Sequence, residues 1–233
     1  MVQLQSEILE GPLEHPLLGR CVVVRPTVET TRANRHPSQA VVVTTAARRL
    51  IELSKAGEKL AAVLVEGEKD PTTHPEFHEI SHNLRELMNK WYPKAKLTLF
   101  AKQAELSKPD TRHALSFYDV PIVNLPGGTQ KVAGKLWGGT IQEHKALVED
   151  LRKIESERLV VESTFVRGDV DNSKDSEVKA WIRNLEGIRP GSFRVSTPSK
   201  AKGGTKPVTK TRIQEIADMV QEKTGVAVEI SEE

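Results

Sequence analysis

The sequence is poor in the side chains that most often carry sulfur chemistry and base stacking. Its 233 residues include a single cysteine, Cys21, so this chain alone can form neither an intrachain disulfide nor a cysteine-rich metal cage. Aromatic residues make up only 4%, and no stretch interleaves them with basic residues as base-stacking surfaces do. Direct recognition of nucleic-acid bases is therefore not expected.

Long apolar runs and a strong net charge are also missing. No apolar run approaches the ~20 residues that a membrane helix needs, and the opening stretch MVQLQSEILEG lacks the pattern of a signal peptide. We expect no membrane association and a cytoplasmic location. A formal net charge of +2 is too small to indicate nucleic-acid binding by itself. The locally basic stretch KAKGGTK lies in residues 199–207, which we expect to form a flexible loop.

The sequence does contain a regular alternation of strand-like and helical patterns. Such alternation is typical of an α/β protein with a mostly parallel sheet, either doubly wound or a full or partial barrel. A chain of this length can form a single domain, residues 1–233. The predicted strands are residues 21–24, 61–65, 96–100, 120–125, 159–166, 193–195 and 226–230. The predicted helices are residues 45–55, 75–91, 110–115, 141–154, 173–185 and 210–224.

In both architectures function gathers at the carboxyl ends of the strands, so the loops that follow the strands matter most. Five stretches resemble, in order, those of compact radical SAM proteins: GPLEHPLLGRCVVV, EGEKDPTTHP, TLFAKQAEL, FVRGDVDNS and IRPGSFRVSTP. The resemblance to the radical SAM superfamily is collinear over nearly the whole chain. It implies a partial (β/α)6 barrel, with residues 1–20 as an N-terminal extension packing on it.

The resemblance also implies a loop that holds three cluster-binding cysteines after the first strand. Here those positions fall on Thr30, Asn34 and Pro37, which keep the spacing and not the chemistry. The 4Fe–4S cluster of the superfamily is held by thiolates, and hydroxyl, amide and pyrrolidine groups do not replace them. Cys21 precedes the loop and is expected to be a small core residue. We therefore expect no cofactor, neither a 4Fe–4S cluster nor S-adenosylmethionine undergoing cleavage.

Two further motifs implied by the resemblance are altered. In the glycine-glycine-glutamate pattern that places the methionyl amino group of the cofactor, Lys69 takes a glycine position and Asp70 the acidic one. A lysine adds bulk and charge where close backbone approach is needed. Lys102 and Gln103 stand where family members carry an asparagine-glycine pair. Together with the missing thiolates, these changes indicate that the cofactor site has decayed.

Two hypotheses follow for the function. The first is a noncatalytic subunit or scaffold, a pseudoenzyme that binds an active protein partner or a larger assembly. The second is a repurposed barrel that binds a small anionic or nucleotide-like molecule, of which S-adenosylmethionine without cleavage is a special case. Its ligand-binding candidates are the charged residues expected at strand ends, Lys69, Asp70, Lys102, Glu162 and Arg167. The same residues are also compatible with solvated loop charges or internal ion pairs.

A metal-dependent enzyme is a variant of the second hypothesis. His74 and His78 are separated by four residues on a predicted helix, a spacing that can bind zinc, and Asp70 could supply a third ligand. His82 continues the series, but it lies ~12 Å of helix rise from His74, so only adjacent histidines can share an ion. The charged neighbours on this helix instead favour a polar outer face.

Overall fold

The computed structural model describes residues 7–28, 36–138, 140–201 and 203–232. The chain separates into two compact units, Met1–Ile122 and Val123–Glu233, where the sequence suggests a single domain. Among the described residues, no helix combines the length and the apolar character needed to cross a bilayer.

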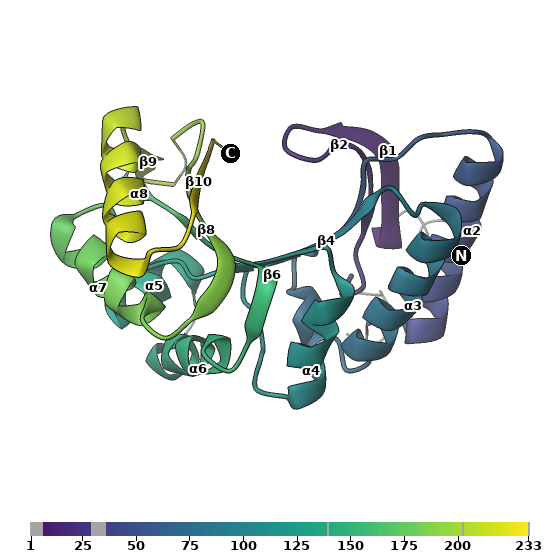
Figure 1. Ribbon diagram of the computed structural model, residues 1–233, viewed down its shortest axis with the longest axis horizontal. Coiled ribbons are helices and arrows are strands. Elements are labelled where there is room, and N and C mark those ends of the chain that lie inside the picture. The colour runs from purple at the N-terminus through teal and green to yellow at the C-terminus, as the bar shows by residue number, and fades with distance from the viewer. Residues whose placement is uncertain (1–6, 29–35, 139, 202, 233) are drawn as a thin grey trace. The chain divides into compact units, whose positions relative to one another are not determined.

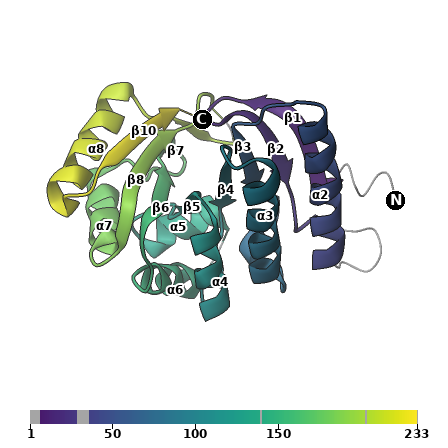
Figure 2. The ribbon, with the colours of Figure 1, turned by 45° about the vertical axis from the view of Figure 1, so that its right-hand side comes forward.

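The first unit contains mainly parallel strands followed by helices. Its strand order is β1-β2-β3-β4-β5, with β1 antiparallel to β2, and with β2, β3 and β4 parallel. Figures 1 and 2 show α2 and α3 lying side by side. The strands are β1 (Leu9–His15), β2 (Gly19–Val24), β3 (Ala62–Val65), β4 (Lys96–Ala101) and β5 (Val120–Asn124), which contains the unit boundary. The helices are α2 (Gln39–Lys55), η1 (Pro71–Thr73), α3 (Phe77–Trp91), α4 (Pro109–Ala114) and η2 (Leu115–Phe117).

Strands β2, β3 and β4 bury both of their faces, as parallel strands usually do. On one face, Cys21, Val23, Ala62 and Leu64 form an apolar cluster that Phe100 helps to cover. The residues that alternate with these along the strands are also buried, and they face the helices: Val22, Val24, Val63, Val65, Leu97 and Leu99. The core of this unit therefore lies on both sides of the sheet.

The second unit repeats the arrangement with different strands. Its strand order is β5-β6-β8-β10, in which β6, β8 and β10 are parallel, and β7 pairs separately with β9. Trp181 packs edge-on against Phe165 and Phe193 in the core. The strands are β6 (Glu155–Thr164), β7 (Val166–Gly168), β8 (Arg189–Thr197), β9 (Thr205–Pro207) and β10 (Val228–Glu232). The helices are α5 (Gln130–Trp137), α6 (Ile141–Leu151), α7 (Asp175–Leu185) and α8 (Lys210–Thr224).

Most predicted elements are present, and the differences have local causes. Helix α2 begins at Gln39, not at residue 45, because Val42 continues the stripe of buried residues that includes Ala46 and Leu50. Helix α5 was not predicted, since the surrounding stretch PGGTQKVAGKLWGGT is rich in glycine and reads as a loop. Thr129 caps it by accepting a hydrogen bond from the Val132 amide.

Two segments contain strands that the sequence pattern did not predict. Within residues 1–20, Leu9–His15 pairs with β2 as strand β1. The predicted flexible loop, residues 199–207, ends in strand β9, which pairs with β7 through Arg167 and Lys206. Ladder hydrogen bonds account for both differences, and neither segment has the strong apolar alternation that marks a strand in sequence.

Candidate functional site

Asp70 lies in the loop that follows β3, where the resemblance places a cofactor motif. It is buried, and its carboxylate accepts hydrogen bonds from the Thr72 amide at 3.0 Å, the Thr72 hydroxyl at 2.6 Å and the Gln103 amide at 2.7 Å. Thr72 in turn accepts a hydrogen bond from the Glu105 amide at 2.8 Å. Burial raises the pKa of Asp70. This carboxylate therefore joins the loops that follow β3 and β4, and it is not presented to a ligand.

Lys69 and Lys102, the predicted cationic partners of Asp70, are both exposed. The Lys69 carbonyl accepts a hydrogen bond from the Thr27 hydroxyl at 2.5 Å, and the Lys102 ammonium lies 5.6 Å from the centre of the Phe100 ring. Lys69 also lines a cavity of about 640 Å³ with Glu7, Arg25, Thr27, Val28 and Glu68. The structure thus joins the backbone around Lys69 and Lys102 to Asp70 and leaves their charges at the surface.

Of the three predicted cluster positions, Thr30 and Asn34 lie outside the described residues. Pro37 is buried, and its carbonyl accepts a hydrogen bond from His74 Nε2 at 2.8 Å. Cys21 is fully buried in β2 within the apolar cluster defined above. Burial raises the pKa of its thiol, so the thiolate that binds metals is disfavoured at this position.

His74 is a buried structural residue. Its Nδ1 accepts a hydrogen bond from the Glu76 amide at 3.0 Å, so the proton of the neutral ring is on Nε2, which donates to the Pro37 carbonyl. Burial lowers the pKa of this imidazole. Because both ring nitrogens are engaged, His74 offers no lone pair to a metal ion.

His78 faces a different residue from the one that the helical spacing suggests. Its Nε2 lies 3.0 Å from Nδ1 of His113, on α4. Among the described residues, no three His, Cys, Asp or Glu side chains come together as a metal-binding group. The predicted set of His74, His78 and Asp70 is therefore not assembled, because Asp70 and His74 are committed to backbone hydrogen bonds. Sequence spacing could not reveal His113, which lies 35 positions away.

In the second unit, the buried Glu162 belongs to a row of charges across three strands. Its Oε2 lies 3.4 Å from Nη1 of Arg194 on β8, whose Nη2 lies 2.8 Å from Glu229 on β10. Ser196 Oγ lies 3.3 Å from Glu162 Oε1. Sequence reasoning missed Arg194 and Glu229. The signal was present, since Arg194 is a charged residue between apolar Phe193 and Val195 in a strand.

Arg167, the other predicted binding residue of the second unit, is exposed on β7. Its Nε donates to the Pro207 carbonyl at 2.9 Å, which fixes β9 beside β7. The neighbouring Asn172 is buried and bridges three segments: it accepts from the Val166 amide and donates to the carbonyls of Pro126 and Thr164. These contacts shape the loop after β7, and the Arg167 side chain is used to hold β9 beside β7.

A cavity of about 580 Å³ lies among the helices of the second unit, and the sequence did not predict it. Lys145, Arg152 and Arg183 give its wall three cationic groups, against one carboxylate from Glu149. Arg152 is fixed by its Nε, which donates to the Glu186 carbonyl at 2.8 Å. The remaining lining residues are Gly128, Thr129, Gln130, His144, Val148, Ala180 and Asn184.

Comparisons with solved structures show the fold. A radical SAM methyltransferase from Sphaerobacter thermophilus matches with a TM-score of 0.54 and 12% identity, over 91% of this chain and 66% of that one. A domain of a pyruvate-formate lyase-activating enzyme from Bacteroides vulgatus matches with a TM-score of 0.55 and 11% identity, over 73% of this chain and 99% of that one. The chain thus spans slightly less than two thirds of the methyltransferase.

No protein-family model and no curated protein matches the sequence. At 11% and 12% identity the structural matches establish the fold alone. The chain has the α/β fold of radical SAM enzymes, and the predicted fold class, a partial (β/α)6 barrel of that type, is confirmed.

Proposed function

We propose that this chain is a cytoplasmic, noncatalytic protein with the fold of radical SAM enzymes, acting as a subunit, scaffold or regulatory partner in a protein assembly. In this proposal it holds no 4Fe–4S cluster and does not cleave S-adenosylmethionine. The fold is retained because the partner recognises its surface, and the chemistry is carried out elsewhere in the assembly.

The observation that carries the proposal is the place of the only cysteine. A 4Fe–4S cluster needs thiolate ligands, and the sequence contains one thiol, that of Cys21. That thiol is packed in an apolar cluster inside a strand, and its pKa is raised. The donor set of this chain therefore does not fit the cluster.

The two other altered motifs support the same conclusion. Asp70, at the acidic position of the glycine-glycine-glutamate pattern, accepts three hydrogen bonds from Thr72 and Gln103 and has become part of the loop structure. Lys69 brings a positive charge to the preceding position. An ammonium group at this position repels the methionyl amino group of S-adenosylmethionine.

Anaerobic reconstitution with iron and sulfide tests the proposal. The wild-type chain is expected to retain no stoichiometric iron and to stay colourless. As a matched control we suggest the triple variant Thr30→Cys, Asn34→Cys, Pro37→Cys, which restores the thiolate spacing implied by the resemblance. Iron near four atoms per wild-type chain, together with reductive cleavage of S-adenosylmethionine, would overturn the proposal. Iron uptake by the triple variant alone would support it.

The partner is tested separately. The tagged chain, purified from its native cells at physiological salt, is expected to elute in a complex well above the 25.9 kDa of one chain and to contain a second protein. Quantitative mass spectrometry should give a fixed ratio of the two proteins over several purification steps. Elution as the chain alone, or only as a homo-oligomer, contradicts the assembly role.

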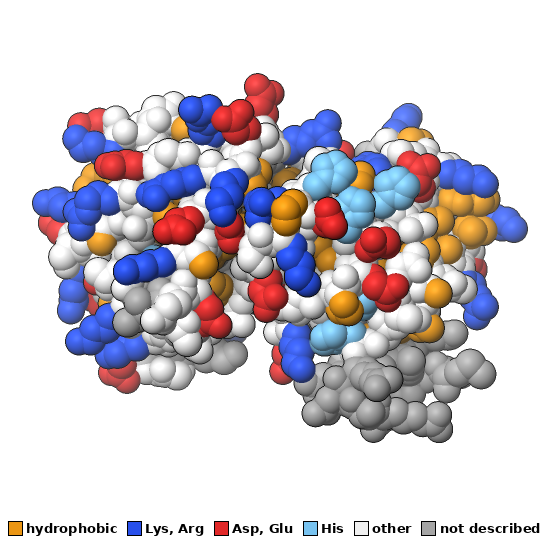
Figure 3. Space-filling view, turned by 90° about the horizontal axis from the view of Figure 1, so that it is seen from below, with side chains coloured by type: hydrophobic (Ala, Val, Ile, Leu, Met, Phe, Trp, Pro, Cys, Tyr) orange, Lys and Arg blue, Asp and Glu red, His pale blue; other side chains and the backbone are white. Residues whose placement is uncertain are grey.

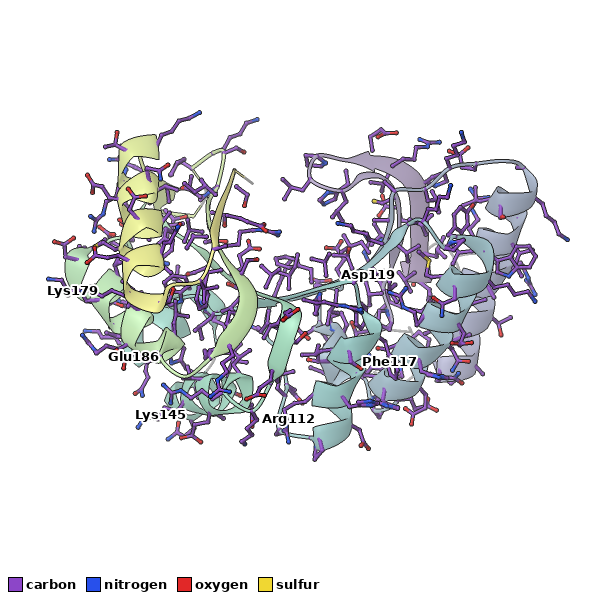
Figure 4. All side chains as sticks on the ribbon, in the orientation of Figure 1. Arg112, Phe117, Asp119, Lys145, Lys179 and Glu186 are labelled. Carbon is purple, nitrogen blue, oxygen red and sulfur yellow. The ribbon has the colours of Figure 1, made fainter. Side chains whose placement is uncertain are left out.

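A second candidate function is binding of a small anionic ligand in the second unit. The cationic wall of the 580 Å³ cavity favours it, because Lys145, Arg152 and Arg183 outnumber the one lining carboxylate, that of Glu149. A fluorescent adenine nucleotide serves as the probe. The variant Lys145→Glu, Arg183→Glu should weaken its binding, whereas Lys179→Glu, an exposed change on α7 that is labelled with Lys145 in Figure 4, should not. Equal affinity in all three proteins would exclude the cavity.

A further inference from the structure

Two histidines from different helices meet on the surface of the first unit. His78 on α3 and His113 on α4 place Nε2 and Nδ1 3.0 Å apart, with ring centres 5.2 Å apart and an interplanar angle of 25°. His78 is partly exposed and His113 is exposed. Figure 3 shows histidine side chains gathered in one patch on this side of the molecule. The pair therefore lies at the surface, with each nitrogen facing the other.

We propose that His78 and His113 form a two-histidine chelate for a divalent transition-metal ion, preferably Ni²⁺ or Cu²⁺. Imidazole nitrogens bind such ions at about 2.0–2.1 Å, so two adjacent ligands at a right angle lie about 2.9 Å apart, and two tetrahedral ligands about 3.3 Å apart. The observed 3.0 Å lies between these two values, so the spacing suits either arrangement. Among divalent ions, Cu²⁺ and Ni²⁺ bind imidazole nitrogens strongly.

The two ligands are held in place before an ion arrives. The buried Ser81 hydroxyl of α3 lies 2.8 Å from the hydroxyl of Tyr118, the residue that follows η2. Arg85, also on α3, donates to the Phe117 carbonyl at 2.7 Å and to the Asp119 carboxylate at 2.7 Å. Figure 4 labels Phe117 and Asp119 beside α4. Because these bonds fix α3 against the segment that carries His113, chelation orders little additional structure.

The surroundings favour a bound cation. His78 Nδ1, the ring nitrogen that faces away from His113, lies 4.0 Å from the Glu79 carboxylate. At this distance the carboxylate is too far for a hydrogen bond, but its negative charge attracts a cation bound by His78. The neighbouring Arg112 directs its Nη1 to the carbonyls of Leu106 and Ser107, at 2.6 and 2.8 Å, so its charge is directed toward the backbone.

The site is open. No third His, Cys, Asp or Glu among the described residues joins the pair, so water or a donor from another molecule fills the other coordination positions. His82 lies nearby, and its ring packs edge-on with the Phe117 ring, with ring centres 5.2 Å apart. The rings of His78 and His113 pack edge-on with the same ring, with ring centres 5.3 Å apart. It shares the aromatic contact without belonging to the chelate, which makes it a matched control.

Calorimetric titration of the untagged full-length chain with NiCl₂ at neutral pH tests the proposal. We expect one saturable site. His78→Gln and His113→Gln should each weaken Ni²⁺ binding about tenfold or more, because either change removes one arm of the chelate. His82→Gln should bind as the wild type does. Circular dichroism and thermal unfolding in EDTA confirm that all three variants are folded.

A second readout identifies the ligands directly. With Cu²⁺, the electron paramagnetic resonance spectrum should show nitrogen hyperfine splitting from two imidazoles in the wild type and from one in either chelate variant. Failure of the wild type to saturate at millimolar Ni²⁺ would overturn the proposal, as would wild-type Ni²⁺ affinity in either His78→Gln or His113→Gln. The pair would then be a simple N–H···N hydrogen bond between neutral imidazoles.

Discussion

In the first unit, one face of the parallel strands carries the apolar side chains of Cys21, Val23 and Leu64. In the second unit, one face of the parallel strands carries the charged side chains of Glu162, Arg194 and Glu229. In the second unit the charged face points away from α7. Phe193, which precedes Arg194 on β8, contacts Trp181 of that helix, and successive side chains of a strand point to opposite faces. Parallel strands thus support an apolar surface in one unit and a charged surface in the other.

The difference indicates where polar chemistry remains possible. An apolar face excludes water and gains stability from burial, but it offers no group that binds a cofactor. The charged face satisfies its buried carboxylate through Arg194 and Ser196. The core of the first unit is therefore held by apolar burial on this face, while the second unit depends on paired charges.

The largest effect is expected from a charge placed on the apolar face. Leu64→Asp buries a carboxylate where Leu64 is 3% exposed and no cation lies among its cluster neighbours. We expect a loss of more than about 4 kcal/mol in the free energy of unfolding. Leu64→Met, which keeps the volume, should lose less than about 1.5 kcal/mol. Urea unfolding followed by circular dichroism measures both. A near-normal midpoint for Leu64→Asp would show that this face is not packed.

A smaller effect should follow from breaking the charged row. Arg194→Met removes a cation that lies 3.4 Å from the Glu162 carboxylate, whose side chain is 5% exposed. Removing one partner of a buried ion pair costs about 3–5 kcal/mol, and we expect the lower end because Arg194 is 16% exposed. The double variant Glu162→Gln, Arg194→Met should recover part of the loss. If the double change is as damaging as the sum of the two single changes, the pair is not coupled.

The two units should respond alike to acid through their buried histidines. Burial lowers the pKa of His74 in the first unit and of His144 in the second. The unfolded chain, with an ordinary histidine pKa of about 6.5, binds protons first as the pH falls. The stability contribution is therefore complete above that pH and is lost as the pH falls through the two folded-state values.

Nuclear magnetic resonance titration of the imidazole carbons checks this prediction residue by residue. His74 and His144 should both titrate below the ordinary range. The urea concentration at the unfolding midpoint should decrease as the pH is lowered from neutral to pH 5. An ordinary titration midpoint for either imidazole would mean that this ring is hydrated. The two units would then differ in their response to acid.

Much of the fold could be predicted because local patterns and tertiary burial agree. Helix α8 occupies the predicted residues 210–224, with Gly225 at its carboxyl end in the left-handed region at a φ of +70°. Helix α5 was missed because the glycines on either side of it dominate the local pattern, whereas in the structure Thr129 accepts a capping hydrogen bond from the Val132 amide and Ala133 is buried.

The candidate site was less predictable, because its residues meet through tertiary contacts. Sequence reasoning placed Asp70 after a strand, but it could not show that Gln103 and Thr72 would engage the carboxylate. It identified His78 as a possible ligand and paired it with His74. Helical spacing gives neighbours on one helix, whereas His113 approaches from another.

The smallest effect is expected on β8 itself, where Arg189 and Arg194 lie on one strand in different environments. The ion pair of Arg189 with Glu155 is exposed on both sides, at 74% and 71%. Such pairs contribute about 0.2–1 kcal/mol, so Arg189→Ala should shift the urea midpoint little, and high salt should remove the shift. Arg194→Met should keep most of its effect in high salt, because its partner is buried. Equal losses at the two arginines would show that burial does not distinguish these ion pairs, and the charged face would then be hydrated like the surface.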